Sequence, residues 1–177
     1  MTMAPGLRKV LLITHVSTSV GWFGAVAAYT ALDVAAVNSQ TIATVRAAHL
    51  AMELIVSYVI VPLAFAALVT GVIQALGTPW GLLRHYWVLA KLLLTTVATL
   101  VLLVEAQTVA AMAQHAASSG DPRGMPGTLP HSIGGLVVLL LITMLSVVKP
   151  QGLTRYGWRK QQEQRRAKAG KRMATTR

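Results

Sequence analysis

Long apolar runs alternate with short polar connections along this chain, and the pattern predicts helices rather than strands. Each run approaches or exceeds the ~20 apolar residues that a helix needs to cross a bilayer. Backbone groups in hydrocarbon must bond within a helix or a closed barrel. We therefore predict an all-α transmembrane four-helix bundle, with spans at residues 10–32, 47–76, 87–112 and 132–148.

The composition fits a single membrane domain and excludes several kinds of site. Of the 177 residues, 54% are hydrophobic and 12% are charged, so lipid is the expected solvent. We expect the bundle to occupy residues 1–148 and a basic tail to occupy residues 149–177. The chain has no cysteine, which excludes disulfides, thiolate metal sites, iron–sulfur clusters and cysteine nucleophiles.

The positive charges predict how the bundle is oriented. In membrane proteins the side with the excess of Lys and Arg normally stays in the cytoplasm. Of the 16 Lys and Arg residues, only Arg46 and Arg123 fall on the side of the first and third connections. We therefore expect a multi-pass protein with both termini in the cytoplasm.

The tail carries most of the net charge of the chain. Residues 149–177 hold ten basic residues and one acid, Glu163, which leaves +9 of the total of +11 in this segment. Each basic residue near an anionic membrane surface adds ~1 kcal/mol of attraction. Anionic lipid is therefore the expected partner of the tail, and no nucleic-acid partner is expected.

Ionisable side chains inside the predicted spans form two layers, and their cost in lipid makes them candidates for function. The inner layer pairs His15 of the first span with Lys91 of the third, at similar depths below the cytoplasmic surface. Trp22 follows His15 by seven residues and lies on the same helix face. The alternative is structural, with a neutral His15 bonded to a neighbouring hydroxyl and Lys91 reaching back to the interface.

The outer layer contains His49, Glu53, Glu105 and His131, at depths that agree within about two helical turns. Two imidazoles and two carboxylates suit zinc or copper, while His49 and His131 could instead hold a haem iron from two helices. The alternative is a hydrated interface, in which Glu105 pairs with His49, His131 or Arg46 between helices.

Two segments carry a family resemblance. His15 is followed seven positions later by a Trp-Phe-Gly sequence, and residues 87–91, Trp-Val-Leu-Ala-Lys, open the third span. This pattern resembles small bacterial membrane proteins related to copper-resistance protein D and to HemJ-type protoporphyrinogen oxidase. Residues 8–148 can be laid against a four-helix unit of that kind, and the likeness is greatest to a branch of predicted integral membrane proteins.

The resemblance implies a bacterial inner-membrane location and a haem or porphyrin pocket. In that pocket His15 is the candidate axial ligand, and Lys91 lies near the propionates. The sequence departs from the family in two respects, because no second histidine is assigned to the family pattern and no methionine-rich copper path is present.

Three functions follow from these patterns. The first is binding of b-type haem or a related tetrapyrrole through His15, Trp22 and Lys91, for electron transfer or porphyrin oxidation. The second is a copper- or zinc-binding or transport component that uses the outer layer. The third is a non-catalytic membrane scaffold subunit. Besides lipid, the expected partners are a second copy of the chain or a redox protein, and the pattern leaves open whether the protein is an enzyme.

Overall fold

The computed structural model describes residues 3–77, 82–118, 121–125, 127–150 and 152–175. Within these ranges the chain is helical and forms no β-strand, although an isolated antiparallel bridge joins His85 to Leu153. The elements in chain order are α1 (Pro5–Asn38), α2 (Ile42–Ile55), a π-helical turn (Val56–Ile60), α3 (Val61–Gly77), α4 (Tyr86–Ala117), a short 3-10 helix (Pro122–Gly124), α5 (Leu129–Val148) and α6 (Arg155–Thr175).

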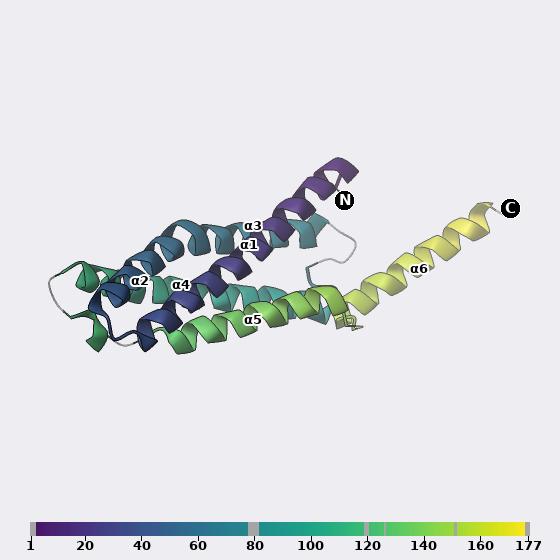
Figure 1. Cartoon of the computed structure of the whole chain (residues 1–177). Coiled ribbons are helices and arrows are strands. Elements are labelled where there is room, and N and C mark those ends of the chain that lie inside the picture. Colours follow the sequence, from purple (N-terminus) through teal and green to yellow (C-terminus); the bar gives the residue numbers. More distant parts are fainter. Residues whose placement is uncertain (1–2, 78–81, 119–120, 126, 151, 176–177) are drawn as a thin grey trace.

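In the described part of the chain, four helical segments are long and apolar enough to cross a membrane, and the all-helical elements confirm the predicted all-α class. They are α1, the continuous segment Ile42–Gly77, α4 and α5, and they run antiparallel in one bundle (Figure 1). Both chain termini lie at one end of this bundle, called here the terminal end. The α1–α2 turn and the α4–α5 connection lie at the other, called the distal end, and α6 extends away from the terminal end (Figure 1).

The helices continue beyond the apolar runs that predict them. Helix α1 extends over 34 residues, to Asn38, whereas its apolar run ends at residue 32. A helix satisfies its own backbone groups, so it continues through the polar residues at its end without loss of hydrogen bonds. The extension places Asp33 on a helix that packs inside the bundle, and not in a connection.

The second spanning segment changes its winding in the middle. Val56–Ile60 form a π-helical turn immediately before α3, which has Pro62 as its second residue. Proline lacks a backbone N–H, and its ring crowds the carbonyl of the preceding turn. The wider turn accommodates this ring while the segment continues from α2 into α3.

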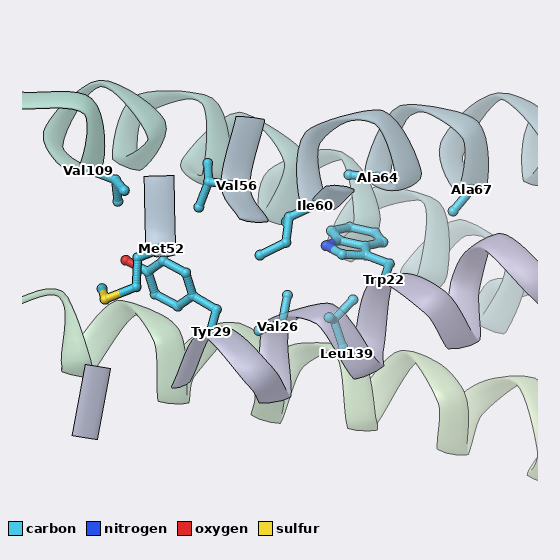
Figure 2. Packing of buried hydrophobic residues seen from close by; sticks show 10 residues of the cluster. All are labelled: Trp22, Val26, Tyr29, Met52, Val56, Ile60, Ala64, Ala67, Val109 and Leu139. Carbon is cyan, nitrogen blue, oxygen red and sulfur yellow. The ribbon is translucent and has the colours of Figure 1, made fainter. Parts of the chain in front are cut away.

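The buried core lies in the middle of the bundle and in its distal half. It combines two large aromatic residues of α1, Trp22 and Tyr29, with small and branched side chains from the facing helices (Figure 2). Small residues allow helices to approach closely, and close packing drives helix association in lipid. The other members of the cluster are Val26, Met52, Val56, Ile60, Ala64, Ala67, Val109 and Leu139.

The terminal half of the bundle is packed differently. Beyond Trp22, Ala67, Thr99 and Leu139 toward the terminal end, no described residue of the four long segments is buried. Side chains there are half-buried or exposed, although Gly71 of α3 lies in close contact with His15 of α1. The buried positions that mark the limit of the core are Trp22 in α1, Ala67 in α3, Thr99 in α4 and Leu139 in α5.

Candidate functional site

His15 lies in the terminal half, on the side of α1 that contacts α3. Its Nδ1 atom is 3.1 Å from the Oγ1 atom of Thr70. Gly71 lies directly beside the ring, and a Cβ atom there would come within 3.0 Å of the His15 Cε1 atom. The glycine therefore lets the backbone of α3 approach the imidazole closely, and the structural alternative of a His15–hydroxyl bond is confirmed.

The hydrogen bonds of Thr70 indicate which tautomer of His15 is present. A hydroxyl carries a single proton, and the Thr70 Oγ1 donates it to the Ala66 carbonyl at 2.6 Å. Oγ1 must then accept a hydrogen bond from the His15 Nδ1–H. The ring also interacts with the backbone of Ala67. In the neutral tautomer with the proton on Nδ1, the lone pair is on Nε2, and a metal ion would bind there.

The other two residues of the predicted inner layer occupy different surroundings. The Lys91 Nζ atom lies 5.6 Å from the centroid of the Trp87 ring, at the start of α4, and is within electrostatic range of the His15 ring. Trp22 is buried in the core beside Ile60 and Ala64 (Figure 2). Core packing accounts for the position of Trp22, about two helical turns further along α1 than His15.

A buried carboxylate that the sequence patterns missed lies at the distal end. Asp33 of α1 has an exposed fraction of 1%, and its Oδ2 atom accepts hydrogen bonds from Thr128 Oγ1 at 2.9 Å and Ser132 Oγ at 3.1 Å. Because Thr128 donates its proton to Asp33, it accepts one from the Tyr29 hydroxyl at 2.7 Å. A directed chain of hydrogen bonds thus runs from Tyr29 through Thr128 to Asp33.

The position of this carboxylate has a physical reason. Thr128 precedes α5 and Ser132 lies in its first turn, so Asp33 faces the N-terminal end of that helix. The positive end of the helix dipole favours a negative charge there. A signal for Asp33 was present in the sequence, because it is one of five acids and follows Tyr29 by four residues, on the same helix face.

His49 of α2 lies close to this network. Its side chain is buried, its Nδ1 atom has no hydrogen-bond partner, and the ring is within electrostatic range of Asp33. Glu105 of α4 meets His131 of α5, with Oε1 and Nε2 3.4 Å apart, which confirms one of the pairings expected from the sequence. Glu53 instead accepts a bond from Ser57 Oγ at 3.2 Å within its own helical segment.

The outer layer does not assemble into a metal centre in this geometry. Within the part of the chain that the structure describes, no group of three or more His, Asp or Glu side chains is arranged to hold a metal ion. Glu105 and His131 engage each other, and Glu53 engages its neighbour one turn along. The four-residue copper or zinc site remains a prediction without support from these contacts.

Two arginine side chains form hydrogen bonds between the connections at the distal end, close to the buried network around Asp33. Arg123 donates to the Gln40 carbonyl at 3.2 Å, and Arg46 donates to the Ser118 carbonyl at 3.1 Å. Arg123 also forms an ion pair with Asp121 at 2.6 Å. Hydrogen bonds from the side chain and backbone of Arg123 lower the pKa of Asp121 to about 2, and the same pairing raises the pKa of Arg123.

Comparisons with protein-family models, with curated proteins and with solved structures gave no match. The likeness to the copper-resistance protein D and HemJ-type group therefore stays a prediction. The functional argument depends on the two polar regions themselves: a closed network around Asp33 and an open, oriented imidazole at His15.

Proposed function

We propose that the protein binds b-type haem or a related tetrapyrrole in the terminal half of the bundle, with His15 as an axial ligand. The observation that carries this proposal is the hydrogen bond between His15 Nδ1 and Thr70, which leaves the ligating lone pair on Nε2. Histidines that ligate metals usually donate their other ring N–H to a fixed acceptor, which sets both the tautomer and the ring orientation.

The surroundings of His15 offer two further features that a tetrapyrrole would use. The side chain is half-buried, so part of its surface is accessible to a ligand. Lys91 provides a cation within electrostatic range of His15, and the propionates of a haem carry the complementary charge. Bound haem supplies one-electron chemistry, while the chain sets the axial ligand and shields the group from water.

The proposed setting is the bacterial inner membrane, with the terminal end on the cytoplasmic side. This orientation follows from the distribution of Lys and Arg, because Arg46 and Arg123 are the only basic residues on the distal side. Trp87 and Trp158 then lie at the cytoplasmic interface, where tryptophan is enriched. A tetrapyrrole beside His15 would lie within the leaflet that faces the cytoplasm.

The direct test is the absorbance spectrum of the full chain, purified in detergent after expression with added haem precursor. A Soret band that is present in the wild type and lost in His15→Ala supports the proposal. The matched control is His115→Ala, because His115 is an exposed imidazole in the last turn of α4 and its removal leaves the band unchanged.

Two outcomes contradict the proposal. A wild-type protein without a Soret band after haem supply removes tetrapyrrole binding and favours the scaffold function. A band that persists in His15→Ala but disappears in a His49→Ala, His131→Ala double variant moves the ligand to the distal end. Pyridine haemochrome analysis of each preparation identifies the haem type and gives the stoichiometry.

A further inference from the structure

A hollow of about 560 Å³ opens at the terminal end, outside the region proposed for the tetrapyrrole. It lies where the start of α4, the end of α5 and the start of α6 meet. Its walls combine aromatic rings with groups that can donate hydrogen bonds. The lining residues used in this argument are His85, Trp87, Lys149, Trp158 and Gln161.

The walls of this hollow are fixed by the backbone. Tyr86 donates its N–H to the Gly152 carbonyl at 3.3 Å, and Thr154 donates its N–H to the Arg84 carbonyl at 3.1 Å. These two bonds flank the bridge between His85 and Leu153 and hold the α5–α6 connection against the chain that enters α4. The hollow therefore exists before any ligand arrives, which lowers the entropic cost of binding.

The start of α6 also packs closely against the chain that enters α4. Thr154 Oγ1 donates to the Leu83 carbonyl at 2.6 Å and accepts the Gly157 N–H at 3.0 Å. Gly157 lies so close to the Arg84 carbonyl that a Cβ atom at this position would overlap with it. Trp158 is thereby held at the rim of the hollow while more than half of its surface stays exposed.

The charge around the hollow is strongly positive. Lys149 lines it, in a left-handed backbone conformation with φ 45°, and lies within electrostatic range of Lys91. Four of the five acids of the sequence belong to the distal half, and the fifth, Glu163, is 4.0 Å from Lys160 on α6. A bound anion would therefore relieve repulsion between like charges at this end.

The surface beside the hollow is suited to lipid chains. Val147 and Val148, at the end of α5, have exposed fractions of 76% and 68% and immediately precede Lys149. A soluble phosphate would use only the polar wall, whereas a phospholipid would use the polar wall and this apolar surface together. Basic pockets of this kind at the cytoplasmic ends of transmembrane helices bind anionic lipid headgroups.

We infer that this hollow is a specific binding site for the headgroup of an anionic phospholipid. Lys149 neutralises the phosphate diester, Gln161 and His85 offer hydrogen-bond donors, and the Trp87 and Trp158 rings cover the glycerol region. This site differs from the diffuse attraction of the tail, because it holds one lipid in one place. It is also independent of tetrapyrrole binding, since a preparation without haem still contains the hollow.

The test is a titration of the detergent-purified full chain with short-chain phosphatidylglycerol, followed by native mass spectrometry. One lipid binds tightly to the wild type, and phosphatidylcholine with the same chains does not compete. Lys149→Gln weakens this binding about fivefold, the factor expected from removal of one basic residue near the phosphate. The control Arg165→Gln removes the same charge from an exposed position of α6 outside the hollow and leaves the affinity unchanged.

A second variant and a second ligand make the test decisive. Trp158→Ala removes one wall through an exposed side chain, and it weakens binding even if Lys149→Gln alters the α5–α6 connection. Equal affinities of the wild type, Lys149→Gln and Trp158→Ala overturn the inference. Displacement of the lipid by millimolar inorganic phosphate also overturns it, because the hollow would then bind a soluble anion and not a lipid.

Discussion

The two halves of this bundle use polar residues in opposite ways. In the distal half, Asp33 is buried with two hydroxyl donors, and the surrounding helices pack tightly around Met52 and Tyr29. In the terminal half, the side chain of His15 is half-buried and bonds to Thr70, and no described residue of the four long segments is buried beyond Trp22, Ala67, Thr99 and Leu139.

The difference shows what holds helices together in lipid. Lipid tails are as apolar as leucine, so association depends on close packing and on hydrogen bonds between helices. The distal half provides both, and it acts as the rigid part of the bundle. In the terminal half the close contact between α1 and α3 is at His15, Thr70 and Gly71, and the side chains there are half-buried or exposed.

The largest expected effect comes from removing packing in the distal half. Met52→Ala empties a fully buried position and lowers the free energy of unfolding by about 3 kcal/mol. The matched change in the terminal half is Leu93→Ala, at a residue whose side chain faces outward, and its effect stays within about 0.5 kcal/mol. Unfolding of both variants in mixed micelles, followed by circular dichroism, measures the difference, and equal losses would remove the contrast between the halves.

The next effect concerns the network around Asp33. Asp33→Leu leaves the Thr128 hydroxyl without its acceptor, while Ser132 keeps the Leu129 carbonyl, and it lowers the free energy of unfolding by about 2 kcal/mol. Asp33→Asn keeps an acceptor oxygen and loses about half as much. The same micelle unfolding assay applies, with Asp121→Asn as the control at an exposed carboxylate. Greater stability of Asp33→Leu would mean that desolvation of the carboxylate outweighs its hydrogen bonds.

A smaller effect tests whether His15 is oriented for a ligand. Thr70→Val removes the acceptor of Nδ1–H and weakens tetrapyrrole binding about tenfold, because the ring loses its fixed tautomer and orientation. The control is Thr143→Val, which removes a hydroxyl that bonds only to the carbonyl of Leu139, in its own helix. Titration of the protein with haem, read from the Soret band, measures the affinity of each variant.

Gly71→Ala sharpens the same test without touching a polar group. The added Cβ would lie 3.0 Å from the His15 Cε1 atom, so the ring must shift and binding weakens. Gly24→Ala is the matched control, because no atom lies within 4 Å of its added Cβ. If Thr70→Val and Gly71→Ala keep the wild-type spectrum and affinity, as the two controls do, the orientation of His15 serves packing alone.

The smallest effect belongs to the exposed ion pair above the distal network. Arg123 holds the pKa of Asp121 at about 2, below its ordinary value of 3.8. The contribution of this pair to stability is therefore complete above about pH 4 and is lost as the pH falls through about 2. Arg123→Gln returns the pKa toward 3.8, which NMR titration of the Asp121 carboxyl carbon measures directly. An unchanged titration midpoint would show that Arg123 does not control this carboxylate.

Much of the fold follows from local patterns. The apolar runs predict the number, order and type of the spanning helices, because a helix in lipid is specified by the length and apolar character of one segment. The pattern also identifies His15 and Lys91 as unusual, since charged or titratable groups are rare inside such runs. It does not identify Asp33, because the apolar run stops one residue earlier and the helix does not.

The arrangement of the candidate site depends on contacts that no single segment encodes. Thr70 lies 55 residues after His15, and Thr128 lies 95 residues after Asp33, so neither pairing can be read from helical spacing. The sequence offered His131 as one of three possible partners of Glu105. It could not select among them, because the pairing depends on how α4 and α5 are rotated about their axes.

The sequence by itself determined an all-helical chain with four membrane-length apolar segments and a strongly basic tail, because helix formation in lipid and charge are local properties. Only the tertiary structure decided that the distal half closes around Asp33, that Thr70 orients His15, and that α6 docks beside Lys149 to form a hollow. The physical reason is that packing and side-chain hydrogen bonds join residues on different helices, and their partners are set by how those helices rotate and approach.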